Sequence, residues 1–178
     1  MRRELSNVVR GRVALVLCNA TCLDEETKVL LNEASIEEVR SVLEKHRECL
    51  ERFYRELLKV VDESSIECVV TTCINGVARE VRKNVVELYG SVSKGLYQVV
   101  PKRIADEVYK CFSIVDTLLL LGLDALLSVV SDYVPVALSM GKNVVVVSKL
   151  GNPFEDLNVT VLRFDVAELR RALCRSIE

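Results

Sequence analysis

Four acidic side chains have the types and positions that metal-dependent hydrolysis could use. Asp116, Asp124 and Asp132 interrupt the most apolar stretch of the chain, residues 115–138, and Glu80 lies in a segment with helical periodicity. Carboxylates gathered at strand ends can hold two divalent cations that clamp the attacking and leaving oxygens of a displacement reaction. The chemistry these four residues could support is therefore nuclease-type hydrolysis.

Other catalytic and cofactor chemistry finds little support in the sequence. The one histidine, His46, lies on an apolar helical seam, where imidazoles are more often packed than catalytic. The chain has no G-x-G-x-x-G, P-loop or G-x-S-x-G motif. We therefore expect no catalytic residue, no cofactor and no nucleotide site.

The cysteines do not have zinc-site spacing, because no pair forms C-x-x-C. Most of them lie in apolar runs typical of core residues. Whether Cys18 and Cys22 or Cys68 and Cys73 pair is left open, since distance and orientation decide that. The full set is Cys18, Cys22, Cys49, Cys68, Cys73, Cys111 and Cys174.

Composition predicts one soluble domain spanning residues 1–178. Half of the residues are hydrophobic and 28% are charged, with a net charge of −2. A chain with this charge is an unlikely partner for nucleic acid, which needs a basic field. The first residues resemble no signal peptide, and the apolar stretch is too often interrupted by aspartate to span a membrane. We expect a cytoplasmic protein without membrane contact, and the many charges and valines suggest a thermophilic, archaeal-like source.

Alternating strand and helix patterns predict an α/β fold, with a mainly parallel sheet between helices. Apolar runs of strand length are followed by segments with helical periodicity. Residues 114–121 could form a strand or the start of a buried helix. The expected strands are 12–18, 67–72, 95–100, 143–148 and 158–164, and the expected helices are 35–62, 77–88, 102–112, 124–140 and 165–177.

The clearest element is a long helix over Ser35–Asp62. Ser35 and Glu38 form a capping box, in which each side chain satisfies a free amide of the other residue. Apolar or semi-apolar residues then recur at heptad spacing at Ile36, Val39, Leu43, His46, Leu50, Phe53, Leu57 and Val60. The pattern predicts a helix that projects or forms a homo-oligomer, and a helix lying across the sheet is the alternative.

The acidic residues give the chain a faint resemblance to PIN-type ribonucleases. The strand ending at Asn19, Glu80 on a later helix and Asp132 before residues 143–148 follow that family's order. Asn19 replaces the first acid, and Lys149-Leu150-Gly151 stands where an aspartate is expected. A protein with this fold would therefore be a degenerate nuclease.

A second resemblance, to the apical domain of group II chaperonins (thermosome-like), covers nearly the whole chain. It rests on the order of several segments: residues 8–15, 68–78, 93–100, 103–112 and 144–163. By this resemblance residues 24–62 are a helical protrusion-like segment and residues 143–178 an intermediate-domain-like return segment. The family's equatorial ATPase domain has no counterpart in the sequence.

The chaperonin resemblance implies a stand-alone, non-enzymatic module that binds non-native polypeptide without ATP. Its partners would be unfolded polypeptide or a chaperonin-like subunit. A heptad-driven oligomeric scaffold is a further alternative. Carried over by position, the polypeptide-binding residues are Ile74, Asn75, Arg79, Arg82, Lys83 and Val86.

Overall fold

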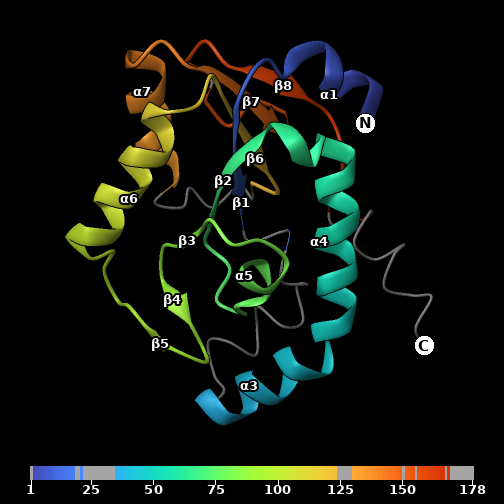
Figure 1. The fold of residues 1–178 in the computed structure, drawn as a ribbon, viewed down its shortest axis with the longest axis vertical. Helices are drawn as coiled ribbons and strands as arrows, with labels where there is room; N and C mark the ends of the chain where they lie inside the picture. Colours follow the sequence, from blue (N-terminus) through green and yellow to red (C-terminus); the bar gives the residue numbers. More distant parts are fainter. Residues whose placement is uncertain are drawn as a thin grey trace.

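The centre of the molecule is a six-stranded sheet in which every neighbouring pair of strands is parallel (Figure 1). The computed structural model describes residues 2–18, 21, 35–123, 130–149, 151–154, 156–166 and 168. The strand order is β3-β2-β1-β6-β7-β8. The strands are β1 (Val13–Leu17), β2 (Ile66–Thr71), β3 (Val85–Glu87), β6 (Thr117–Leu121), β7 (Asn143–Val147) and β8 (Thr160–Leu162). The predicted α/β class with a mainly parallel sheet is confirmed.

The central strands form because their side chains are apolar on both faces. Every residue of β1 and β6 is buried, and both strands consist of Val, Leu and Ala apart from Thr117. Parallel strands covered on both faces read as continuous apolar runs of this kind. Residues 114–121, left open by the sequence, therefore contain a strand.

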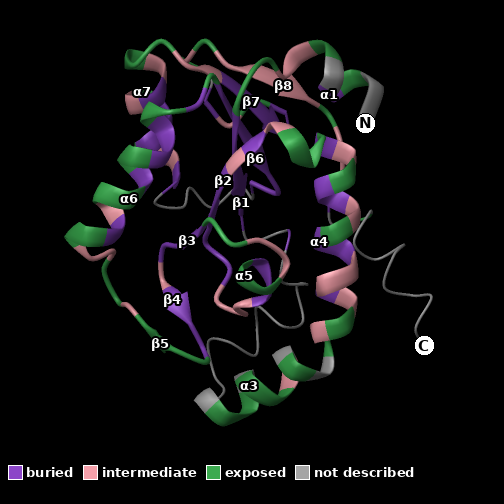
Figure 2. Ribbon diagram, viewed as in Figure 1, coloured by how far each residue is buried: buried purple, intermediate pink, exposed green. Residues whose placement is uncertain are grey.

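Helices cover both faces of the sheet (Figure 2). On one face, α6 (Lys102–Ser113) and α7 (Val130–Ser139) pack on one set of alternate strand residues, including Ala14, Val16 and Leu120. On the other face, α1 (Arg2–Val8), α4 (Arg47–Val61) and α5 (Val77–Val81) pack on the other set. The result is a three-layer sandwich with two apolar cores.

Smaller elements extend from the β2–β3 side of the sheet. The helix α3 (Ile36–Lys45) precedes α4, and the short 3-10 helix η2 (Glu63–Ser65) follows it. A two-stranded antiparallel sheet of β4 (Gly90–Ser91) and β5 (Gly95–Leu96) lies between β3 and α6 in the sequence. In Figure 1, α3, α5 and this small sheet lie at the same end of the molecule.

The predicted long helix is divided into two, and its apolar seam lies on the sheet. Glu38 N donates to Ser35 Oγ at 3.4 Å and Ser35 N donates to Glu38 Oε2 at 2.7 Å, which confirms the capping box. His46 ends α3 and precedes α4. The residues Leu50, Phe53 and Leu57 are buried in the core beneath α4. The expectation that the seam of the Ser35–Asp62 helix projects or drives a homo-oligomer is therefore wrong for α4.

The predicted helix over residues 77–88 is also wrong. The helix α5 ends at Val81, and Val85–Glu87 pair with Val69–Thr71 as strand β3. Arg82 already has an extended backbone, with φ −141° and ψ 144°. The paired valines 85 and 86 favour a strand once β2 is available as a partner. The predicted helix over 165–177 and residues 24–34 of the predicted protrusion lie largely or wholly outside the described residues.

No helix in the described part of the chain is both long and apolar enough to cross a membrane.

A disulfide joins the sheet to one of its covering helices. Cys68 of β2 pairs with Cys111 of α6, with 6.1 Å between their Cα atoms. Cys49 and Cys73 are disulfide-bonded as well, whereas Cys18 is a buried thiol. The open possibility that Cys68 pairs with Cys73 is thereby excluded.

Removal of the Cys68–Cys111 disulfide is expected to lower the free energy of unfolding. The bond closes a loop with a sequence separation of 43, and loop-closure entropy gives a stabilisation of about 4 kcal/mol for such a loop. We expect the double variant Cys68→Ala/Cys111→Ala to lose up to this amount in guanidinium unfolding under oxidising conditions. Cys18→Ala, which deletes a buried sulfur outside any disulfide, controls for the cavity. Equal losses in the two variants would contradict the prediction.

Candidate functional site at the carboxyl edge of the sheet

The sheet has a topological switch point between β1 and β6. From β1 the chain moves outward to β2 and β3, and from β6 it moves the other way to β7 and β8. Because all six strands are parallel, their carboxyl ends share one edge. In open α/β sheets ligands bind outside this edge, at the point where the two crossovers leave in opposite directions. The order β3-β2-β1-β6-β7-β8 therefore marks a candidate site beyond β1 and β6.

Buried hydroxyl groups follow the central strands at this edge. Thr21, Thr71, Thr72 and Ser148 are all at most 4% exposed. The Thr21 hydroxyl donates to the Cys18 carbonyl at 2.6 Å, and the Thr71 hydroxyl accepts from a backbone N–H at 3.0 Å. These hydroxyls are held in place by the chain itself. Sequence reasoning missed them, although Thr72 and Ser148 directly follow the buried runs of β2 and β7.

The first described residue after each of the four central strands is uncharged, and the cation Lys149, one position further after β7, is paired with Asp165 at 3.0 Å. The uncharged residues are Cys18 after β1, Thr72 and Cys73 after β2, Gly122 and Leu123 after β6, and Ser148 after β7. Gly122 has φ +70°, a conformation that side chains oppose. No carboxylate in this described set would repel an anion. Residues 19–20, 22–34 and 124–129, which continue from β1 and β6, lie outside the described residues.

The turn after β2 carries a buried amide donor. Asn75 Oδ1 accepts from Val77 N at 3.0 Å, and Gly76 has φ +77°. This bond fixes the orientation of the Asn75 amide. Its Nδ2 is buried and has no hydrogen-bond partner among the described residues. A buried donor left unpaired costs about 1–3 kcal/mol, so this atom is a good candidate for a ligand contact.

The six residues predicted to bind polypeptide do not share one helix face. Ile74 and Asn75 lie in the turn before α5, and Lys83 is exposed beyond it. Val86 lies on β3 and packs in the core beneath α6. Arg82 pairs with Glu63 at 3.2 Å and donates to the Ile66 carbonyl. Whether any of these residues contacts a ligand stays a prediction.

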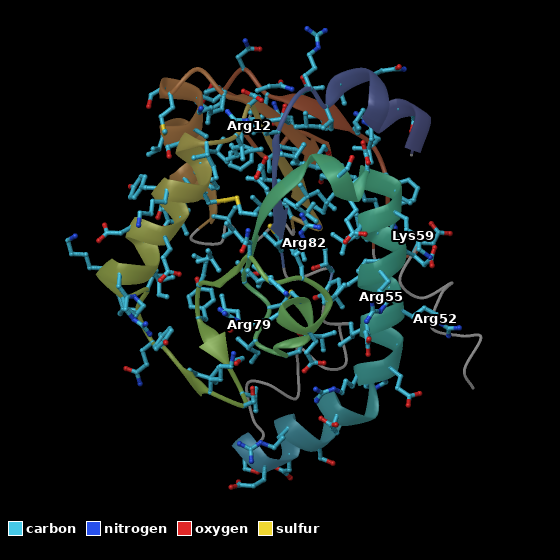
Figure 3. The ribbon with its side chains drawn as sticks, in the orientation of Figure 1. Arg12, Arg52, Arg55, Lys59, Arg79 and Arg82 are labelled. Carbon is cyan, nitrogen blue, oxygen red and sulfur yellow. A yellow bond between two sulfur atoms is a disulfide. The ribbon has the colours of Figure 1, made fainter. Side chains whose placement is uncertain are left out.

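Arg79 neutralises a buried carboxylate at the end of β3. Its Nε lies 3.1 Å from Glu87 Oε2, and its Nη2 donates to the Val85 carbonyl at 2.9 Å. Glu87 is only 5% exposed. Its other oxygen, Oε1, is buried without a hydrogen-bond partner in the described structure. Figure 3 labels Arg79 and Arg82 near α5, and the bonds given above tie both guanidinium groups to the chain.

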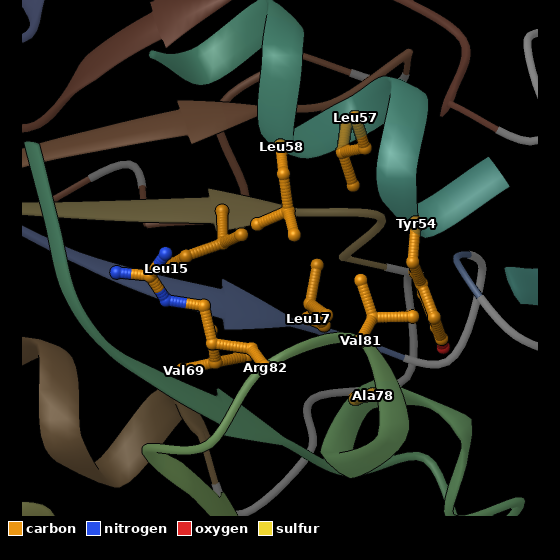
Figure 4. Close-up of a pocket in the computed structure, with 9 residues that line it drawn as sticks. All are labelled: Leu15, Leu17, Tyr54, Leu57, Leu58, Val69, Ala78, Val81 and Arg82. Atoms are coloured by element: carbon orange, nitrogen blue, oxygen red, sulfur yellow. The ribbon is translucent and has the colours of Figure 1, made fainter. Parts of the chain in front are cut away.

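An apolar cavity lies between α4, α5 and the sheet (Figure 4). The centre of a water-sized sphere can occupy only about 10 Å³ within it. This is the space of about one water, and apolar cavities of this kind stay dry. It therefore provides no ligand site. Its walls are Leu15, Leu17, Tyr54, Leu57, Leu58, Val69, Ala78, Val81 and Arg82.

The acidic residues proposed for metal chemistry are not gathered. Asp116 precedes β6, at the amino edge, where its Oδ2 accepts from Arg12 N at 2.8 Å. Glu80 lies on α5 and pairs with Arg47, and Asp132 lies on α7. Within the described residues no group of three or more His, Cys, Asp or Glu could hold a metal. Asn19 and Asp124 lie outside those residues.

The sequence matches no protein-family model and no curated protein sequence. Solved structures do match the fold. A sirtuin structure that addresses the structural basis of substrate affinity aligns with a TM-score of 0.63 and 16% sequence identity. The alignment covers 99% of this chain and 98% of that chain. The chain has a Sir2-like fold. A Sir2 homologue with bound ADP ribose gives a TM-score of 0.62 and 12% identity, over 98% and 95%. A Sir2 structure with a p53 peptide and NAD gives a TM-score of 0.63 and 15% sequence identity, over 99% of this chain and 98% of that chain.

These matches overturn the interpretation drawn from the sequence. The resemblance to a chaperonin apical domain is wrong, because Sir2 structures match the fold over nearly the whole chain. The predicted non-enzymatic chaperone function is therefore wrong as well, and the matches support neither of the alternatives, a PIN-like nuclease or an oligomeric scaffold. The predicted partners, unfolded polypeptide or a chaperonin-like subunit, are likewise wrong. The matching proteins carry NAD, ADP ribose or acylated peptides instead.

The Arg79–Glu87 pair is expected to stabilise the carboxyl edge through charge neutralisation. Arg79→Met should lower the free energy of unfolding by about 1–3 kcal/mol, because it leaves the Glu87 carboxylate buried and unpaired. The partial exposure of Arg79 keeps this loss moderate, because solvent screens its charge. Adding Glu87→Gln should recover most of that loss. Urea unfolding of the two single variants and the double variant measures this coupling. If the losses in the two single variants simply add in the double variant, the interaction between Arg79 and Glu87 contributes nothing to stability.

Proposed function

We propose that this chain is an enzyme that binds NAD or an ADP-ribosyl compound at the carboxyl edge and removes acyl groups from peptides. The observation that carries the proposal is the switch point between β1 and β6, present in a chain whose fold aligns end to end with Sir2 structures. Among those structures are complexes with NAD, with ADP ribose, with 2'-O-acetyl ADP ribose and with a propionylated peptide.

The described residues at the edge are compatible with such a nucleotide. The hydroxyls of Thr72 and Ser148 can donate to phosphate or accept from ribose hydroxyls, whereas the Thr21 hydroxyl, which donates to the Cys18 carbonyl, can only accept. No carboxylate directly follows the central strands in the described residues to oppose a pyrophosphate, and Gly122 lets a backbone approach closely at the end of β6. The absence of a G-x-G-x-x-G motif means that side-chain hydroxyls would carry more of this binding than in the common dinucleotide folds.

Bound NAD supplies an ADP-ribosyl group that can accept an acyl group, as the matching structure with 2'-O-acetyl ADP ribose and a deacetylated p53 peptide indicates. The chain's own contribution is to hold the nucleotide and to manage protons beside it. His46 is exposed at the junction of α3 and α4. Nearer the edge, Cys18 directly follows β1, Glu87 ends β3, and Tyr89 lies two positions beyond β3. These three are the groups that proton transfer at the edge would use.

Nucleotide binding is tested by calorimetry with NAD, ADP ribose and AMP. We expect NAD and ADP ribose to bind. Ser148→Ala should weaken them about 2- to 10-fold through loss of one hydrogen bond. Ser139→Ala is the matched control, because that hydroxyl lies at the end of α7 and donates only to the Val136 carbonyl. Equal affinity in both variants would place the nucleotide elsewhere, and no binding of either nucleotide would refute the proposal.

Deacylation is tested with lysine peptides carrying acetyl, propionyl or myristoyl groups. The expected result is loss of the acyl group from the peptide only when NAD is present. Mass spectrometry measures both products, the deacylated peptide and the acylated ADP ribose. Acyl removal that proceeds equally without NAD would contradict the proposed reaction. Binding of nucleotide with no turnover of any of the three peptides would leave a nucleotide-binding protein rather than a deacylase.

A further inference from the structure

A polar cleft lies beside the candidate nucleotide site, between α3, the Asn75–Gly76 turn with α5, and the segment after β4. The centre of a water-sized sphere can occupy about 130 Å³ of it. This is roughly ten times the least space that one water needs, so the cleft suits a solute the size of an amino acid. Its walls are Arg40, Glu44, Arg47, Asn75, Val77, Glu80, Val92 and Ser93.

One end of the cleft presents unused hydrogen-bond donors. Arg40 Nη2 donates to the Val92 carbonyl at 3.3 Å, its one hydrogen bond within the described structure. A guanidinium has five N–H donors, so most of those of Arg40 remain available. Val92 N in turn donates to the Ile74 carbonyl at 2.9 Å, which brings this end next to Asn75. The buried, unpaired Asn75 Nδ2 adds a neutral donor.

The other end of the cleft carries an excess of carboxylate. Arg47 Nη1 lies 3.0 Å from Glu44 Oε2, and Arg47 Nη2 contacts Glu80 Oε1. The hydrogen bond to Glu44 and the charge of Glu80 raise the pKa of the Arg47 guanidinium. Two carboxylates share one cation, so this end has a net charge of −1. With Arg40 at the far end, the cleft as a whole is neutral but its charges are separated.

We propose that this cleft binds a small zwitterion, an amino acid or a short peptide with both termini free. Its carboxylate would lie on Arg40 and Asn75 Nδ2, which together match a planar acceptor. Its ammonium group would lie beside Glu44 and Glu80, and Val77 and Val92 would contact an aliphatic side chain. A pyrophosphate is disfavoured here because it would face two carboxylates. The site is separate from the proposed nucleotide site and does not depend on it.

The proposal is tested by thermal unfolding of the full chain with alanine, valine and alanyl-alanine. N-acetylalanine, alanine amide and N-acetylalanine amide serve as blocked forms, and pyrophosphate as the competing anion. We expect unfolding to shift upward with the zwitterions alone, and the stronger of free amino acid or dipeptide identifies the source. Loss of either terminal charge should weaken binding about tenfold or more, as expected for a charge-assisted hydrogen bond.

Two variants locate the ligand within the cleft. Asn75→Asp keeps the acceptor for Val77 N but removes the donor, and Arg40→Gln removes the cation; each should weaken the zwitterion about tenfold. Lys59→Gln, on the exposed side of α4 and paired within the described residues with Glu56, is the matched control. No shift with any zwitterion at about 10 mM, a concentration that detects even weak affinity, would overturn the proposal. So would equal binding of the blocked forms, or binding of pyrophosphate alone. Nucleotide affinity measured on Arg40→Gln, whose residue lies outside the candidate nucleotide site, separates this site from the proposed function.

Discussion

The burial of β1 is the constraint on which the rest of the structure depends. All five of its residues are buried, between β2 on one edge and β6 on the other and between helices on both faces. A strand enclosed in this way must be apolar throughout, so it can carry no chemistry within its length. Polar groups can appear only where the strand ends. Because its neighbours are parallel to it, their polar ends collect at the same edge, and the candidate site follows from that packing.

The placement of charged side chains around this edge matters more than the net charge of the chain. The first residues after the central strands are neutral, and several carry hydroxyls. The charged side chains near them are paired, as Lys149 is with Asp165 beyond β7 and Arg79 is with Glu87 at the end of β3. A chain with a net charge of −2 can thus offer an uncharged surface to a nucleotide. Arg47 of α4 has a second effect, because it pairs with Glu44 of α3 and with Glu80 of α5 and so links the two helices on either side of His46 to the β2–β3 side of the sheet.

The sequence predicted elements well wherever local pattern decides them. The apolar runs at β1, β2 and β7 and the capping box at Ser35 depend on neighbouring residues only, and all four were predicted. Strand β3 was not, because Val85–Glu87 become a strand only against β2. Strand order depends on pairings such as that of β1 with β6, whose paired residues Val13 and Thr117 are 104 positions apart. A resemblance built on the order of weak segments contains no such pairing, which is why it gave the right class and the wrong function.

The Cys68–Cys111 disulfide has a topological consequence. It closes the chain into a covalent ring that contains α5, β3, β4, β5 and most of α6. Asn75, Arg79 and Glu87 all belong to this ring, and so does the exposed stretch with Leu96 and Val99. A protease that cuts this stretch would therefore release no fragment, and the two new ends would stay tethered to the sheet. The edge that gathers the polar groups is thus built from a segment that can be opened without being lost.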